Sequence, residues 1–165
     1  TAEKNIFAIG DVVGGYMLAH EGSYEGKIAA EVISGMDSAY DTNCVPAVIF
    51  SDPEIAYCGL TESVAEKEDI QYKSAKFPWS ANGRALILGH TNGFTRLLTD
   101  PDTERILGVG IVGRGAGDLI SEGALAVEMA SVAEDMAMTI HPHPTLSETL
   151  MEAAEAASGS AMHSA

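Results

Sequence analysis

The sequence predicts an α+β fold, in which an antiparallel sheet is flanked by helices and a single strand–helix segment precedes them. After residue 44, short apolar segments are separated by turn residues and follow one another closely, as strands joined by hairpins do. Segments with apolar residues at helical spacing come next. The first forty residues differ, because one apolar strand enters a helix through a glycine-rich loop. We therefore divide the chain into residues 1–40 and 41–165.

The first segment predicts one strand and one helix. Residues 6–9 (IFAI) indicate a short buried strand, and a helix is predicted over residues 18–33. Gly35 should end this helix, and the polar residues 36–43 should form a linker. A strand as apolar as this one normally pairs with a neighbouring strand on each side, yet few residues precede it in the chain. We therefore expect the chain to be part of something longer.

The second segment predicts five strands and four helices. The strands are expected over residues 45–50, 55–58, 71–78, 94–99 and 106–112. The connection 100–105 (DPDTER) has turn chemistry and predicts a hairpin between the last two strands. The first helix is expected to start at residues 61–63. The other three are expected to cover residues 119–130, 132–138 and 145–157. The tail from residue 158 should fray.

Composition argues against several classes of partner. The chain has 165 residues, 46% of them hydrophobic, and a formal net charge of −15. Such an acidic surface repels nucleic-acid phosphates, and no segment suggests membrane binding. Cys44 and Cys58 lie in apolar surroundings and form no CxxC pair. They predict reduced core cysteines in a protein of the cytoplasm or the mitochondrial matrix, although the sequence leaves a disulfide open.

The stretch HPHPTLSE, residues 141–148, allows three interpretations. Thr145 and Glu148 have the spacing of a capping box, in which Thr145 caps a helix and Glu148 reaches back to the Thr145 amide. A metal site at His141 and His143 is disfavoured, because alternate residues of an extended segment point to opposite sides. No cluster of other ligands completes such a site, so we expect no bound metal.

The third interpretation is an acid–base pair of His143 and Glu148. A histidine can take up and return a proton near neutral pH. A carboxylate bonded to its far nitrogen holds the tautomer and stabilises the imidazolium. Such a pair needs a nucleophile, for example a thiol. Neither Cys44 nor Cys58 has the surroundings of a reactive thiol, so the nucleophile should come from elsewhere.

Two sites near the N-terminus could bind a ligand. Asp11 follows the predicted strand, where sheets of this kind bind ligands and where a carboxylate can accept a bond from a ribityl hydroxyl. It could equally cap the turn. Residues 17–20 (Met17, Leu18, Ala19 and His20) open the helix, and free amides there could face an anion or a flavin carbonyl. They could also be an ordinary helix start.

Several separated stretches together resemble a known family. They are, in chain order, IFAIGDV, MLAH, VPAVIFSDPEIAYCGLTE, FPWSANGRA, RILGVGIVGRGAGDLISEGALAVE and IHPHPTLSE. This series is similar to the C-terminal third of the pyridine nucleotide–disulfide oxidoreductases, and the resemblance covers nearly the whole chain. The last motif is the most specific, and it is most similar to the members that oxidise dihydrolipoamide. Glutathione reductases typically have a small polar residue in place of Leu146.

The resemblance implies a division of labour within the chain. Residues 1–40 would be the end of an FAD-binding domain, in which Asp11 binds the ribityl chain and residues 17–20 approach the flavin. Residues 41–165 would be the interface, or dimerisation, domain of a homodimer. His143 would act as the base in the active site of the opposite subunit, and Glu148 would orient it. The peptide between His143 and Pro144 is often cis in this family.

The resemblance also implies an activity for the whole protein. It would oxidise the dihydrolipoamide of lipoyl domains in 2-oxo acid dehydrogenase complexes and reduce NAD through a redox disulfide and FAD. This chain lacks the redox cysteine pair and the glycine-rich nucleotide fingerprints. We therefore expect the chain alone to be inactive and not to retain FAD. The alternatives are a glutathione reductase-like or mercuric reductase-like enzyme, or a non-catalytic dimerisation module.

Overall fold

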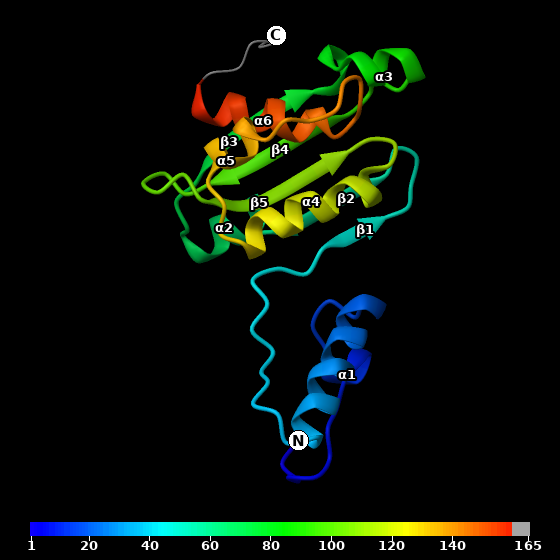
Figure 1. Cartoon of the computed structure of the whole chain (residues 1–165), viewed down its shortest axis with the longest axis vertical. Helices are drawn as coiled ribbons and strands as arrows, with labels where there is room; N and C mark the ends of the chain where they lie inside the picture. The colour runs from blue at the N-terminus through cyan, green and yellow to red at the C-terminus, as the bar shows by residue number, and fades with distance from the viewer. Residues whose placement is uncertain (160–165) are drawn as a thin grey trace. The chain divides into compact units, whose positions relative to one another are not determined.

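The computed structural model describes residues 1–159, which form two compact units (Figure 1). The first unit comprises Thr1–Thr42, and the second begins at Asn43. Fraying was expected for the tail 158–165, but Ser158 is the last residue of α6, and residues 160–165 lie outside the described part of the chain.

The first unit consists of a 3₁₀ turn, η1 (Gly10–Val13), and one helix, α1 (Ala19–Ile33). Gly22 of α1 lets η1 approach, because a Cβ atom at Gly22 would lie 3.0 Å from Cα of Gly10. The Gly10 amide also donates a hydrogen bond to Glu25 Oε2, at 2.6 Å. The predicted helix is thus present, and Gly35 follows its end with a φ of +86°.

The strand predicted at residues 6–9 is not formed. Ile9 has extended backbone angles, φ −141° and ψ 157°, but no segment of residues 1–42 is a strand that could pair with it. The side chains expected to be buried are therefore exposed, Ile6 to 58% and Ile9 to 43%. A strand needs the backbone of a neighbour to satisfy its hydrogen bonds, and this unit offers none.

The second unit is built on a five-stranded antiparallel sheet, as predicted. Its strands are β1 (Ala47–Ile49), β2 (Ile55–Gly59), β3 (Lys73–Pro78), β4 (Phe94–Thr99) and β5 (Ile106–Val112). They lie in the order β1-β2-β5-β4-β3. The expected hairpin of β4 and β5 is present, with Leu97 opposite Val109. The pairing of β2 with β5 joins strands that are distant in sequence, and no local pattern indicates it.

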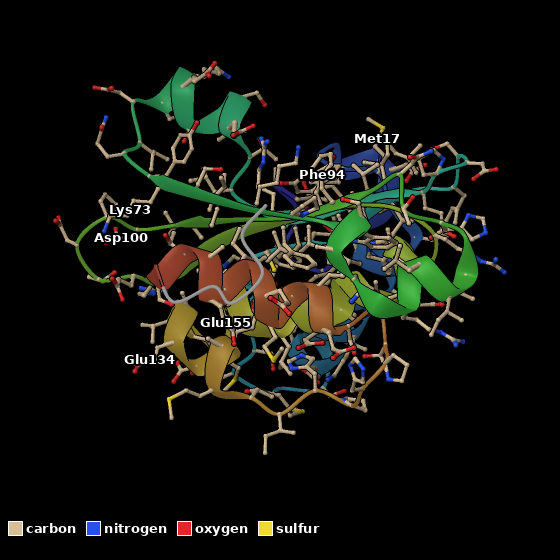
Figure 2. All side chains as sticks on the ribbon, turned by 90° about the horizontal axis from the view of Figure 1, so that it is seen from above. Met17, Lys73, Phe94, Asp100, Glu134 and Glu155 are labelled. Carbon is tan, nitrogen blue, oxygen red and sulfur yellow. The ribbon has the colours of Figure 1, made fainter. Side chains whose placement is uncertain are left out.

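Three helices pack on one face of the sheet: α4 (Ala116–Glu128), α5 (Ala133–Met138) and α6 (Glu148–Ser158). Helix α4 lies against β5, β2 and β1, α6 lies against β3 and β4, and α5 packs on α6. Figure 2 shows Glu134 and Glu155 on this helical side of the sheet. The hydrophobic core fills the space between, and Leu97, Ile111 and Leu150 are fully buried in it.

Three helical details differ from the prediction. Helix α4 ends at Glu128, so Ala130, which has a φ of +54°, lies beyond it. Helix α6 begins at Glu148 instead of Thr145. Two short elements, η2 (Trp79–Ala81) and α3 (Gly83–Leu88), were not predicted. They are too short to show helical periodicity, although Asn82 caps α3 by accepting a bond from the Ala85 amide. The predicted helix after Thr61 is α2 (Glu62–Glu68).

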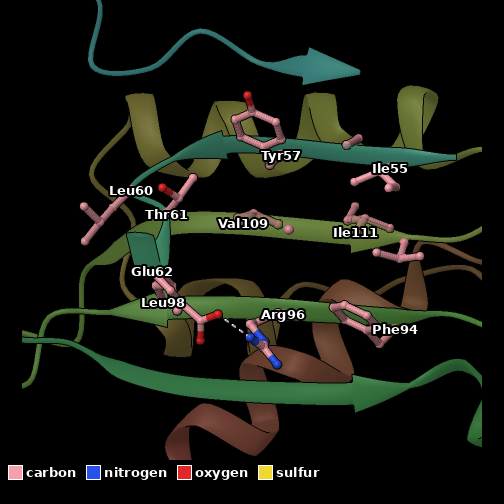
Figure 3. A pocket seen from close by; sticks show the side chains of 13 residues that line it. Ile55, Tyr57, Leu60, Thr61, Glu62, Phe94, Arg96, Leu98, Val109 and Ile111 are labelled. Carbon is pink, nitrogen blue, oxygen red and sulfur yellow. Dashed lines mark hydrogen bonds and ion pairs between the residues drawn. The ribbon is translucent and has the colours of Figure 1, made fainter. Parts of the chain in front are cut away.

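A shallow groove crosses the strands β2, β5 and β4 (Figure 3). Gly110 stands between Tyr57 and Arg96 in the sheet register, so the groove is open at the point where a side chain is missing. Arg96 pairs with Glu62 at the edge of the groove.

The two cysteines are core residues, as predicted. Among the described residues neither forms a disulfide, and Cys58 is buried whereas Cys44 is partly buried. The two thiols lie beside each other. Burial raises the pKa of Cys58 to about 12, which keeps this thiol protonated at physiological pH.

Candidate functional site

The HPHPTLSE motif occupies the connection between α5 and α6, which we call the histidine loop (residues 139–147). The peptide bond between His143 and Pro144 is cis. The loop is short, and both of its ends are attached to helices that pack against the core. Its side chains are therefore held by the sheet-and-helix framework.

His143 forms a hydrogen bond with Glu148, the first residue of α6, and the atoms Nδ1 and Oε1 are 2.8 Å apart. An ionised carboxylate only accepts hydrogen bonds, so Nδ1 carries the proton. In the neutral ring, Nε2 then keeps its lone pair. The His143 side chain is 76% exposed, so this nitrogen is open to an incoming proton donor. The pair has the arrangement of a general base with its orienting carboxylate.

Glu148 is fixed by a second hydrogen bond. Its Oε2 accepts from the Thr145 amide at 2.7 Å, and the side chain is only 13% exposed. Burial raises the pKa of Glu148, but the Thr145 amide and the neighbouring His143 outweigh this effect and hold the pKa below its ordinary value. Glu148 is therefore ionised at any pH at which His143 could act as a base.

The predicted capping box is only half formed. Glu148 does reach back to the Thr145 amide, as expected. The Thr145 hydroxyl does not cap α6, however, because it donates to the carbonyl of Pro142 at 2.7 Å. The N-cap position belongs to Ser147, whose side chain makes no capping bond. The hydroxyl thus closes the turn that carries His143 and does not start the helix.

Asn82, a residue distant in sequence, holds the loop from the side. Its buried amide nitrogen donates to the Thr145 carbonyl at 3.1 Å, while its oxygen caps α3. The next residue, Gly83, lies against the imidazole, because a Cβ atom there would be 3.8 Å from Cε1 of His143. Asn82 therefore ties the start of α3 to the histidine loop.

A buried chain of hydrogen bonds connects the loop to the sheet. Trp79 Nε1 donates to the Thr95 hydroxyl at 3.0 Å, and Thr95 donates to the Thr149 hydroxyl at 2.8 Å. The Thr149 hydroxyl in turn donates to the Leu146 carbonyl at 2.7 Å. All three polar side chains are inaccessible to water, so each bond is needed to offset the cost of burial.

His141 lies on the same loop but has a different environment. Its side chain is 5% exposed, and its two ring nitrogens contact the Thr139 carbonyl at 2.8 Å and Glu122 Oε1 of α4 at 2.7 Å. The two histidines thus bind different carboxylates. Among residues 1–159, no group of three or more possible ligands is placed to hold a metal ion.

The N-terminal site residues all belong to the first unit. Asp11 is exposed within η1, and its carbonyl accepts a bond from the Gly14 amide. Met17 is exposed and has a φ of +55°, Leu18 is the N-cap of α1, and Ala19 and His20 open the helix. Met17 is labelled in Figure 2. Asp11 and residues 17–20 offer a carboxylate and a helix start, which are groups that suit a ribityl chain and a flavin carbonyl.

Sequence analysis missed Asn82, Glu122 and the chain from Trp79 to Thr149. Their partners are far away in sequence, since Asn82 is 63 residues from Thr145 and Glu122 is 19 residues from His141. One signal was available for Asn82, because it lies within the stretch FPWSANGRA that contributed to the family resemblance. Nothing in a single sequence indicates its partner.

Comparison with known proteins places this geometry in context. Residues 45–154 match the family model described as pyridine nucleotide-disulphide oxidoreductase, dimerisation domain. The dihydrolipoyl dehydrogenase of Bacillus subtilis is 53% identical over 163 residues, and that of Staphylococcus aureus is 50% identical. Each match covers 99% of this chain and 35% of the relative. The chain therefore spans about a third of the length of these relatives.

Solved structures have the same fold. The crystal structure of LpdA from Mycobacterium tuberculosis matches with a TM-score of 0.85 and 29% identity, over 91% of this chain and 33% of that one. The HOCl-induced flavoprotein disulfide reductase RclA from Escherichia coli has a TM-score of 0.82 and 24% identity, over 91% of this chain and 35% of its own, and supports the fold alone. Within the described residues, no helix has the length and apolar character required to cross a membrane.

Proposed function

Because this chain belongs to the pyridine nucleotide–disulfide oxidoreductase family and its residues 45–154 match the dimerisation domain, we propose that it is the C-terminal part of a dihydrolipoyl dehydrogenase. Relatives with that name share 53% and 50% sequence identity with it over nearly its whole length. The observation that carries the proposal is the hydrogen bond between His143 and Glu148, together with the exposure of the His143 side chain.

In the whole protein, His143 would remove the proton from a thiol of dihydrolipoamide. Nε2 gains the proton, the imidazolium is stabilised by Glu148, and the thiolate is released to attack a disulfide. Cys58, which is buried and protonated, is unsuited to that disulfide, so the redox pair would lie outside this chain. FAD and NAD would carry the electrons onward, and the groups of this chain that suit FAD are Asp11 and residues 17–20. The chain alone would be inactive.

A homodimer would place His143 in the active site of the opposite subunit. Four large apolar side chains are exposed along α4, α5 and the histidine loop, and we call them the apolar patch: Leu125, Met129, Met138 and Ile140. Ile140, the most exposed of them at 95%, directly precedes the histidine motif. A second copy that covered this patch would lie beside His143. Lipoyl domains of 2-oxo acid dehydrogenase complexes would supply the substrate.

The decisive experiment is His143→Gln in the full-length protein. Because glutamine cannot accept the proton, kcat for dihydrolipoamide should fall by about 10²–10⁴-fold. Steady-state kinetics with NAD measures this, and His90→Gln, at an exposed histidine outside the histidine loop, should leave kcat unchanged. Normal turnover by His143→Gln would refute the role of His143. Preference for glutathione disulfide over dihydrolipoamide in the unmodified protein would refute the substrate.

A further inference from the structure

His141 has an unusual pair of hydrogen-bond partners. Its side chain is 95% buried, and Nδ1 lies 2.8 Å from the Thr139 carbonyl while Nε2 lies 2.7 Å from Glu122 Oε1. A backbone carbonyl can only accept a hydrogen bond. An ionised carboxylate is likewise only an acceptor. Both contacts are therefore hydrogen bonds only if both ring nitrogens of His141 carry a proton.

A neutral imidazole has just one N–H group, so it could satisfy one partner and would set a lone pair against the oxygen of the other. The alternative is a protonated Glu122 that donates to Nε2. Water reaches the Glu122 side chain, which is 35% exposed, and this favours the ionised carboxylate at neutral pH.

We infer that His141 is an imidazolium with a proton on each ring nitrogen, held between Glu122 and Thr139, and that it positions the neighbouring base His143. This inference rests on the proposed function of His143 in one respect, since a positioning residue needs a base to position. The two histidines would then have opposite roles. His141 offers two N–H groups and no lone pair, whereas His143 keeps Nε2 available for a proton.

The surroundings of His141 favour a positive charge. Glu122 contacts His141 from α4. Glu148, at the start of α6, is close enough for its carboxylate to interact electrostatically with His141. Helix α5 carries Asp135, whose carboxylate accepts from the Val132 amide at the start of that helix. No lysine or arginine is paired with any of these three carboxylates among the described residues. The imidazolium therefore balances locally negative charge.

The clamp also completes the mechanical support of the loop. On one side of His143, the ring of His141 joins the loop to α4 through Glu122. On the other side, Glu148 and Asn82 hold the backbone of Thr145. His143 thus lies between two anchors, and loss of the His141 anchor would allow the imidazole of His143 to drift.

The test is the protonation of His141 in the ¹⁵N-labelled 165-residue chain at pH 7.5. A long-range ¹H–¹⁵N correlation spectrum separates the two nitrogens of each ring, and the spectrum of His141→Gln identifies the signals. We expect both nitrogens of His141 at imidazolium shifts, and His143 as a neutral ring with the proton on Nδ1. One protonated and one bare nitrogen on His141 would overturn the inference, whatever the activity of the enzyme.

A matched pair of variants checks the cause. The amide of Glu122→Gln can donate to Nε2, so His141 should become a neutral ring protonated on Nδ1 only. Glu134→Gln, at an exposed position on α5, should leave the His141 signals unchanged. An unaltered imidazolium in Glu122→Gln would contradict the assignment to Glu122. The wild-type spectrum remains decisive even if this variant folds poorly.

The positioning role has its own readout in the full-length protein. Glu122→Gln should lower kcat by about 10–100-fold with little change in KM, because a small displacement of a catalytic group can cost up to about 100-fold in rate. The substitution removes the negative charge of Glu122 and the positive charge of His141 together, so the local net charge is unchanged and the pH midpoint of kcat should not move. An unchanged kcat would refute the positioning role. Failure of the proposed function has a different signature, since it requires normal turnover by His143→Gln.

Discussion

At the scale of single residues, Glu148 connects local structure with chemistry. One carboxylate oxygen holds the Thr145 amide, and the other holds Nδ1 of His143. The capping and acid–base interpretations of the motif are therefore compatible, because the two functions use different oxygens. What the sequence could not indicate is that the Thr145 hydroxyl would turn away to Pro142.

Glu148 should make the stability of the chain depend on pH. Replacement by glutamine, which weakens both bonds, should cost about 1–3 kcal/mol at pH 7. Because the folded-state pKa of Glu148 lies below its ordinary value, its contribution is complete above about pH 4.5 and is lost as the pH falls through the folded-state pKa. Urea unfolding of wild type and Glu148→Gln between pH 2 and pH 7 measures the difference. A difference that stayed constant over this range would contradict the prediction.

At the scale of elements, the two glycines of β5 are alike in sequence but not in structure. Gly108 and Gly110 alternate with apolar residues in the same strand, and both suggest a missing side chain. A Cβ atom at Gly108 would lie 2.0 Å from the Leu60 carbonyl oxygen. A Cβ atom at Gly110 would meet nothing within 4 Å, because it would enter the open groove. Only Gly108 is required by packing.

Alanine substitutions should separate the two positions. Gly108→Ala forces a backbone to move, so the free energy of unfolding should fall by about 1–3 kcal/mol or more. Gly110→Ala should be neutral or stabilising by up to about 1 kcal/mol, because it restricts the unfolded chain without a clash. Chemical denaturation measures both. Equal effects of the two substitutions would show that the close approach of Leu60 does not determine the cost of a side chain at position 108.

At the scale of the whole molecule, the apolar patch distinguishes this unit from a self-sufficient domain. The sheet and helices bury a complete core, yet Leu125, Met129, Met138 and Ile140 remain exposed on the helical side. Such a set favours an interface over a solvated surface. The match to a dimerisation domain identifies a second copy as the expected occupant.

Charged residues in the apolar patch should dissociate the dimer. Leu125→Glu combined with Met129→Glu removes buried apolar area and introduces charge, so the dimer Kd should rise by at least about 100-fold. Sedimentation velocity over a range of micromolar concentrations measures the change. Val64→Glu, at an exposed position on α2, should leave the dimer intact. A wild-type chain that sedimented as a monomer would refute this interface.

Features that depend on neighbours in the chain could be predicted from local sequence patterns. Turn chemistry predicted the β4–β5 hairpin and periodicity predicted helix α1, whereas the spacing of His143 and Glu148 left an acid–base pair as one of three interpretations. The strand at residues 6–9 could not be predicted correctly in this way, because a strand depends on a partner that this unit lacks. Tertiary structure alone decided the clamp of His141 by Glu122 and the bond from Asn82 to Thr145. Those contacts form because the packing of the sheet and helices brings together segments that are far apart in sequence. A local sequence pattern does not indicate such packing.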